Sequence, residues 1–261
     1  MDASELCCIA CKGGEMIMDR SVCPICGGGN LSKLSKRIYK CGSCDAAFSW
    51  NENILHIKST ADIYKSAIES VLEISGITDG EELCGTGIII SSDGYVLTNS
   101  HIISGSESET DGVKNFCDII VAGRRPHETL FKAELVYDDS AADLALLHCP
   151  DAVGATPLKI SWNPIKAGEK VCVIGNGKGE GLSIVDGIIS DTRREISGRS
   201  LIMISAPVTM GYSGGPVLNS VGEFIGMVTG GREDATAMNY AIPSLTIQKF
   251  LSEAKKKIKF K

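Results

Sequence analysis

The chain has 261 residues, of which 43% are hydrophobic and 22% charged, and its formal net charge is −6. This composition is ordinary for a globular protein, and the length leaves room for one large or two unequal domains. The acidic balance argues against nucleic acid as the default partner, although it leaves room for a local basic patch. No apolar run approaches the roughly 18 residues needed to span a bilayer, so we expect no transmembrane segment.

Eleven cysteines occur in the chain, and six of them form three Cys-x-x-Cys pairs within the first 50 residues. In a secreted protein so many cysteines would suggest disulfides. Residues 1–15, however, lack the basic segment and apolar core of a secretory signal peptide. Paired cysteines in a chain without a signal favour metal binding in a reducing compartment, so we expect a cytoplasmic protein.

Residues 1–50 are expected to form a zinc-ribbon module. Two Cys-x-x-Cys pairs supply four thiolates, which structural zinc prefers in a tetrahedron, and Phe48 and Trp50 would cover a very small core. The second and third pairs resemble the two knuckles of a zinc ribbon. The favoured ligands are Cys23, Cys26, Cys41 and Cys44, with Cys8 and Cys11 as an alternative pair. The metal would be structural and would supply much of the folding free energy of so small a module.

The role of this module is left open by the sequence. Zinc ribbons bind nucleic acids, bind proteins or brace a neighbouring domain. The segment between the last two cysteine pairs is basic and contains Lys33, Lys36, Arg37 and Lys40. A solvated hairpin face explains these charges at least as well as an anion-binding surface does.

Residues 51–60 are polar and irregular, and we interpret them as a linker. Residues 61–243 then show a short helical pattern followed by many short β-branched runs with glycine turns, which is typical of an all-β domain. The clearest hairpin joins residues 85–90 and 95–98 through a Ser-Asp-Gly turn. Further strands are expected at 70–74, 116–121, 129–137, 144–148, 171–177, 182–190, 201–206, 224–230 and 239–243. A helix with a basic tail, capped by its first serine, is predicted over residues 244–261, with Ile247, Phe250 or Leu251, Ala254 and Ile258 on one face.

Three polar residues lie in an order that suggests nucleophilic catalysis. His101 ends a predicted strand, Asp143 directly precedes an apolar strand, and Ser213 lies within a Gly-Tyr-Ser-Gly-Gly-Pro turn. Each residue alone would more often be structural. Together they follow the His…Asp…Ser order of chymotrypsin-type enzymes. In such a set the serine hydroxyl needs an adjacent base, and the base needs a buried carboxylate that fixes its tautomer.

These residues, together with the stretch GTGIIISSDGYVLTNSHII, give the region from about 61 to 243 a close resemblance to trypsin-like serine proteases of the HtrA/Deg type. The resemblance implies a chymotrypsin-type fold of two six-stranded β-barrels. The residues that it assigns are His101 as base, Asp143 as its carboxylate partner and Ser213 as nucleophile, with the backbone N–H groups of Gly211 and Ser213 as the oxyanion hole.

Two positions depart from the family pattern. Gly177 stands where the family usually has proline, so we expect a more mobile loop there. Tyr212 stands where the family commonly has asparagine, which bears on the resting conformation of the nucleophile loop. Asp138 and Asp139 compete with Asp143 for the carboxylate role, but they match the solvent-facing acidic turn of the family.

The predicted function is that of a serine endopeptidase that acts on proteins or peptides and needs no cofactor for catalysis. The residues expected to line a small apolar specificity pocket are Val208, Val228, Thr229 and Gly230, which predicts cleavage after small aliphatic residues. Many HtrA proteins carry a PDZ domain after the protease region, and none is expected in this sequence. The alternative is a catalytically silent protease-like scaffold whose zinc ribbon binds a protein or nucleic acid. The oligomeric state is left open.

Overall fold

The computed structural model describes residues 11–12, 15–16, 29–34, 39–43, 47–48, 58–78, 81–104, 119–123, 131–232, 234–235 and 237–258. The chain divides into two compact units, Met1–Lys58 and Ser59–Lys261. The division falls in the segment interpreted as a linker. The C-terminal helix, predicted as a separate segment, belongs to the second unit.

The described part of the first unit contains short antiparallel strands. They are β1 (Cys11–Lys12) and β2 (Glu15–Met16), which pair, and β3 (Leu31–Lys33), β4 (Tyr39–Cys41) and β5 (Ala47–Phe48), which form a three-stranded sheet in this order. Leu31 lies opposite Cys41 across β3 and β4. The Cys41 side chain is buried at the end of β4.

The second unit begins with α1 (Thr60–Ala67) and the 3-10 turn η1 (Ile68–Ser70). Ser59 caps α1, because its Oγ accepts a hydrogen bond from the backbone N–H of Asp62 at 3.1 Å. A first closed barrel follows, with strand order β10-β11-β8-β7-β6-β9. Its strands are β6 (Val71–Thr78), β7 (Glu81–Ile89), β8 (Tyr95–Thr98), β9 (Ile119–Gly123), β10 (Phe131–Asp139) and β11 (Leu144–His148). The short helix α2 (Ser100–Ile103) follows β8.

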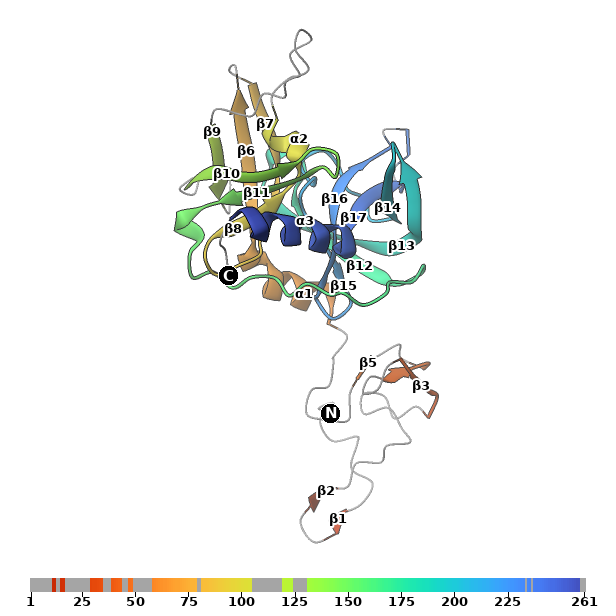
Figure 1. Cartoon of the computed structure of the whole chain (residues 1–261). Helices are drawn as coiled ribbons and strands as arrows, with labels where there is room; N and C mark the ends of the chain where they lie inside the picture. Colours follow the sequence, from red (N-terminus) through yellow and green to blue (C-terminus); the bar gives the residue numbers. More distant parts are fainter. Residues whose placement is uncertain are drawn as a thin grey trace. The chain divides into compact units, whose positions relative to one another are not determined.

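A second closed barrel has the strand order β12-β13-β14-β17-β16-β15. Its strands are β12 (Lys170–Asn176), β13 (Leu182–Ile196), β14 (Arg199–Ile204), β15 (Pro216–Asn219), β16 (Phe224–Gly231) and β17 (Asn239–Pro243). Two 3-10 turns are η2 (Pro150–Ala152), which follows β11 in the sequence, and η3 (Gly177–Gly179), which follows β12. The helix α3 (Ser244–Lys257) closes the chain and lies across the two barrels (Figure 1).

Buried apolar side chains fill each barrel and the junction between them. Leu72, Val96 and Leu147 belong to the core of the first barrel, and Val173 and Val217 belong to that of the second. A third cluster joins strands of both barrels to the helices, and it includes Ile63 of α1, Leu97 of β8, Leu146 of β11, Phe224 of β16 and Ile247 of α3. Because this shared core is apolar and fully buried, it fixes the two barrels against each other.

The predicted mostly β chain with a C-terminal helix is confirmed. On α3, Ile247, Phe250 and Ala254 form the buried face that the spacing predicts. Ser244 is the first residue inside this helix rather than its cap, since the N-cap is Pro243 and no side chain caps the helix. The strand predicted at 116–121 is observed as β9, whose last residue is Gly123. In the described part of the chain, no helix has the length and apolar character required to cross a membrane.

Candidate active site

His101 and Asp143 form a close pair at one edge of the first barrel. His101 Nδ1 lies 2.9 Å from Oδ1 and 3.0 Å from Oδ2 of Asp143. The backbone N–H of His101 also donates to Asp143 Oδ1 at 3.1 Å. A carboxylate accepts hydrogen bonds, so Nδ1 carries the proton and Nε2 is left as an acceptor. The Asp143 side chain is 10% exposed and that of His101 49%, so the imidazole faces solvent while its partner is buried.

The turn between β10 and β11 places Asp143 under the ring. Asp143 has a left-handed backbone conformation with φ of 59°, and aspartate tolerates this better than most residues. Its carbonyl oxygen accepts from Nδ2 of the fully buried Asn99 at 2.9 Å. Asp138 and Asp139 stabilise the same turn, accepting from the Ser140 hydroxyl and the Ala142 backbone N–H respectively.

A second set of donors meets the Asp143 carboxylate from the second barrel. The Thr229 hydroxyl donates a short hydrogen bond to Oδ2, and Nη1 of Arg199 lies 3.3 Å from the same oxygen. Arg199 also donates to Thr229 Oγ1 at 3.4 Å. Burial raises the pKa of Asp143, but hydrogen bonding and charge from His101, with the Thr229 hydroxyl, lower it more, so the net pKa lies below the ordinary value. Asp143 therefore stays ionised beside the imidazole.

The loop that carries Ser213 has two backbone N–H groups with no acceptor among the described residues. The Met210 carbonyl accepts from Lys178 N–H at 2.8 Å, and the Tyr212 carbonyl accepts from Gly215 N–H at 2.8 Å. In a trans peptide the C=O and N–H point in opposite directions, so the N–H groups of Gly211 and Ser213 point away from these contacts. Neither N–H donates to another group among the described residues. Two adjacent unpaired donors of this kind can bind an oxyanion.

Gly211 adopts a φ of 93°, and a Cβ placed there would lie 2.0 Å from the Asn176 carbonyl oxygen. Only glycine fits this position, because the left-handed φ and the close backbone both exclude a side chain.

Thr86 of β7 connects the Ser213 loop to the first barrel. Its N–H donates to the Ser213 carbonyl at 2.8 Å, and its hydroxyl donates to the Gly211 carbonyl at 2.7 Å. The Thr86 carbonyl in turn accepts from the hydroxyl of Thr98, at the end of β8 and three residues before His101. Sequence reasoning missed this link, although Thr86 lies in the conspicuous Gly-Thr-Gly stretch.

The structure thus brings His101, Asp143 and Ser213 into one region, but only the first two contact each other directly. His101 and Asp143 are hydrogen-bonded, and Ser213 is half-buried in a loop that Thr86 joins to β7. Within the described residues, no hydrogen bond joins the Ser213 hydroxyl to the His101 ring. Such contacts are commonly loose without substrate and tighten in the bound complex.

The residues predicted to line a specificity pocket have distinct environments. Val228 is 1% exposed and belongs to the core of the second barrel, and Val208 packs against that core. The hydroxyl of Thr229 is engaged by Asp143. A Cβ at Gly230 would meet nothing within 4 Å, so the chain leaves open space at that point of β16.

Of the predicted zinc ligands, Cys41 alone has a described side chain. The Ser43 backbone N–H points at its sulfur, with N 3.3 Å from Sγ. Cys11 lies in β1, and the side chains of Cys8, Cys11, Cys23, Cys26 and Cys44 lie outside the described residues. Among the side chains that are described, no group of three or more metal-ligating residues gathers.

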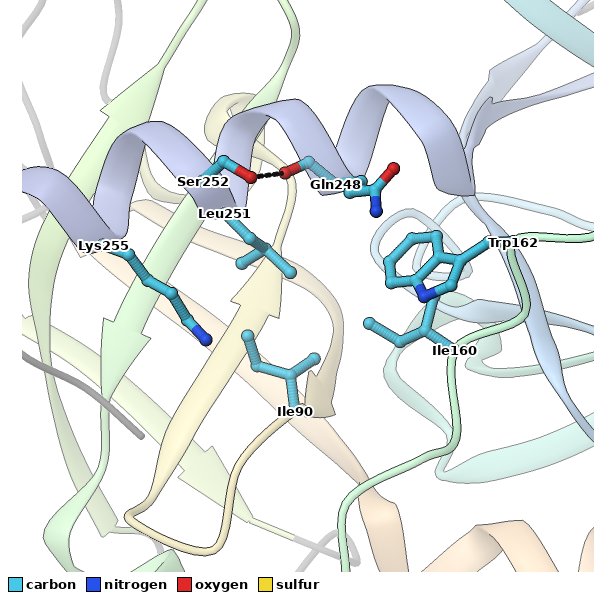
Figure 2. Close-up of a pocket in the computed structure, with 7 residues that line it drawn as sticks. All are labelled: Ile90, Ile160, Trp162, Gln248, Leu251, Ser252 and Lys255. Carbon is cyan, nitrogen blue, oxygen red and sulfur yellow. Dashed lines mark hydrogen bonds between the residues drawn. The ribbon is translucent and has the colours of Figure 1, made fainter.

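A pocket of about 230 Å³ lies beside α3, away from the predicted site residues. Figure 2 shows that Ile90, Ile160 and Trp162 face Gln248, Leu251 and Lys255 of the helix across it. The Ser252 hydroxyl, also at its edge, donates to the Gln248 carbonyl at 2.8 Å.

Comparisons with known proteins identify the family. The model of the trypsin-like peptidase domain matches residues 85–227. The serine endoprotease DegS of Haemophilus influenzae is 32% identical over 211 residues, which cover 74% of this chain and 58% of the relative. A probable periplasmic serine endoprotease DegP-like of Pseudomonas savastanoi is 34% identical over 146 residues, covering 55% of this chain and 28% of the relative. The chain therefore spans less than two thirds of the length of these curated relatives.

Solved structures show the same similarity. A serine endoprotease from Yersinia pestis has a TM-score of 0.64 at 27% identity, over 76% of this chain and 67% of that chain. A protease from M. tuberculosis in its active form has a TM-score of 0.63 at 25% identity, over 76% of this chain and 85% of that chain. These likenesses support the chymotrypsin-type fold and the HtrA type inferred from the sequence. The chain belongs to the trypsin-like peptidase family.

Proposed function

We propose that this chain is a serine endopeptidase of the HtrA type, in which Ser213 is the nucleophile, His101 the base and Asp143 its orienting carboxylate. The observation that carries the proposal is the buried Asp143 carboxylate bonded to Nδ1 of a solvent-facing His101. The N–H groups of Gly211 and Ser213, which have no acceptor in the part of the chain that the structure describes, support it.

Each step of peptide hydrolysis then has a group to perform it. Nε2 of His101 takes the Ser213 proton as the hydroxyl attacks the substrate carbonyl carbon, and Asp143 stabilises the resulting imidazolium. The N–H groups of Gly211 and Ser213 hold the negative oxygen of the tetrahedral intermediate. His101 passes its proton to the leaving amine as the peptide bond breaks. Water, activated by the same base, then hydrolyses the acyl-enzyme.

The proposal includes a preference for small aliphatic residues before the cleaved bond. The apolar surroundings of Val208 and Val228 and the open space at Gly230 support it. A library of peptides that varies this one position tests the preference. Enrichment of valine, alanine or leucine is expected, and enrichment of arginine or lysine would contradict it.

Labelling with a fluorophosphonate probe tests the nucleophile. The parent protein should be labelled and should cleave an unstructured protein substrate, and Ser213→Ala should do neither. Ser252→Ala is the matched control, because this hydroxyl lies on α3 and donates to the Gln248 carbonyl of the same helix. Labelling that survives Ser213→Ala would overturn the assignment. A parent that is folded but neither labelled nor active would favour the silent scaffold.

We propose further that Cys23, Cys26, Cys41 and Cys44 hold one structural zinc ion. The Ser43 N–H that points at the Cys41 sulfur supports this, because such a donor stabilises the negative charge of a metal-bound thiolate. The burial of Cys41 fits a closed site with no water ligand. The zinc would brace the small β3-β4-β5 sheet and take no part in peptide hydrolysis.

Metal analysis of two variants distinguishes the possible ligand sets. Cys23→Ser should lose the zinc, whereas Cys8→Ser should keep one ion per chain. Loss in both variants would favour the pairing of Cys8 and Cys11 with Cys23 and Cys26, and Cys41→Ser would then retain the metal. A parent chain purified without chelator and free of zinc would contradict the proposal.

A cytoplasmic location remains part of the proposal. The buried, reduced thiols of Cys149 and Cys172 support it, since burial raises the pKa of both and leaves them as inert apolar groups. The DegP-like relative from Pseudomonas savastanoi is named as a probable periplasmic protease, which weighs against it. Cell fractionation with a tagged chain decides, and recovery in the periplasm would overturn the location.

A further inference from the structure

The side chain of Tyr212, directly before Ser213, lies in the core of the second barrel. It is 4% exposed and packs in the same cluster as Val173, Ile204 and Val217. A residue in a turn normally has its side chain at the surface. Here the turn is anchored through a large aromatic ring, so its backbone cannot move without displacing a core residue.

Two glycines make the space that the ring fills. A Cβ at Gly175 would lie 2.6 Å from Cδ1 of Tyr212, and a Cβ at Gly177 would lie 2.9 Å from Cε2. Both distances are shorter than real contacts allow. The ring of Tyr212 therefore lies directly against the end of β12 and the start of η3, where any other residue type would displace it.

The hydroxyl of Tyr212 fixes the other end of the ring. Its Oη lies 2.8 Å from Oγ of Ser183 on β13, and either hydroxyl can be the donor. Ser183 is paired with Gly175 in the β12–β13 ladder, and its Oγ lies 3.5 Å from the Gly175 carbonyl oxygen. The ring is thus bounded by two adjacent strands and hydrogen-bonded to one of them.

This anchor lies next to the contacts that orient the loop. Lys178, the residue after Gly177, donates the hydrogen bond that fixes the Met210 carbonyl. We propose that Tyr212 is a positioning residue, which together with Gly177 and Ser183 holds the loop so that the N–H groups of Gly211 and Ser213 stay open. The catalytic value of this holding rests on the proposed function, whereas the holding itself can be measured without any activity.

Removal of either hydroxyl tests the anchor. Tyr212→Phe and Ser183→Ala should each lower kcat about threefold to tenfold, the usual effect of one hydrogen bond, with little change in KM. The double variant should be no worse than either single variant, because both remove the same bond. Tyr64→Phe is the matched control, because its hydroxyl donates to the carbonyl of Leu182, the neighbour of Ser183, rather than to a group of the loop.

Hydrogen exchange separates this proposal from the proposed function. The amides of residues 209–214 should exchange faster in Tyr212→Phe and Ser183→Ala than in the parent and in Tyr64→Phe, while the amides of β14 stay unchanged. A parent protein that fails to react with the phosphonate would overturn the proposed function, but the comparison of exchange rates would stay valid. Unchanged exchange and unchanged kcat in Tyr212→Phe, or additive losses in the double variant, would overturn the anchor.

Gly177→Ala tests the packing from the other side. Gly177 does not have a left-handed φ, so the added Cβ acts through its contact with the ring. The variant should lower kcat and raise exchange over 209–214, and the same substitution should change little once Tyr212→Leu has removed the ring. An equal effect in both backgrounds would contradict the role of the contact. Should Tyr212→Leu fail to fold, the hydroxyl variants above still decide.

Discussion

The guanidinium group of Arg199 lies 3.3 Å from Oδ2 of Asp143, the oxygen that also accepts from Thr229. Arg199 is the first residue of β14 and follows the two-residue turn Ser197-Gly198. Both turn residues have left-handed φ values, of 50° and 75°, as tight hairpins require. The hairpin therefore delivers a cation, 31% exposed, to the carboxylate that contacts His101.

We predict that Arg199→Gln lowers the free energy of unfolding by about 1 kcal/mol, because the buried Asp143 carboxylate loses a partly buried cation at 3.3 Å. Arg199→Lys should keep most of this contribution because it keeps the charge. Denaturant unfolding at neutral pH compares the parent and both variants. Equal stability of the parent and Arg199→Gln would contradict a contribution from this ion pair.

The lowered pKa of Asp143 predicts an acid-dependent contribution to stability. Its folded pKa lies below the value near 3.9 of an unfolded aspartate, so the ionised form is the stabilising one. This contribution is complete above about pH 4 and is lost as the pH falls through the folded pKa. The difference in unfolding free energy between the parent and Asp143→Asn should therefore be larger at pH 7 than at pH 3. Denaturant titrations at the two pH values measure it, and a constant difference would contradict the prediction.

Site residues that lie next to a clear strand or turn pattern can be located from the sequence. His101 follows a β-branched run, and Asp143 precedes an apolar strand, so strand periodicity places each beside a strand. The prediction that His101 ends its strand is wrong, because β8 ends at Thr98 and His101 lies in the short helix α2. The glycines around Ser213 identify the loop because a turn with these backbone angles needs them. The buried face of α3 is likewise predicted by the helical spacing of its apolar residues.

Local sequence patterns do not predict which side chains these residues contact in the fold. Thr86, Ser183 and Arg199 each contact a group that lies 29 or more residues away, and each fits an ordinary β-strand pattern. Periodicity reports which face of a strand is buried but not which side chain it meets. Nothing local indicates that the Tyr212 ring fills the space beside Gly177, where the more mobile loop stays a prediction.

Thr86 is predicted to stabilise the fold and the Ser213 loop together. Its fully buried hydroxyl donates to the Gly211 carbonyl and accepts from Asn176 N–H. Thr86→Val keeps the shape but leaves both groups unpaired, so unfolding free energy should fall by about 2–4 kcal/mol. Thr86→Ser restores both hydrogen bonds and should lose much less. Denaturant unfolding compares the three proteins, and equal stability of the valine and serine variants would refute the role of the hydroxyl.

Alanine substitutions at Gly211 and Gly198 allow the effect of backbone strain to be compared with that of steric exclusion. Both have left-handed φ values, of 93° and 75°. A Cβ at Gly198 would meet nothing within 4 Å, whereas one at Gly211 would lie 2.0 Å from the Asn176 carbonyl oxygen. Gly198→Ala should therefore lower stability by about 1–2 kcal/mol through strain alone and leave phosphonate labelling intact. Gly211→Ala should lower stability further and abolish labelling, because the loop must move away from β12 and turn the N–H of residue 211 from its position. Thermal unfolding and probe labelling of both variants measure this, and similar results for the two would show that the loop absorbs the added methyl group without moving its donors.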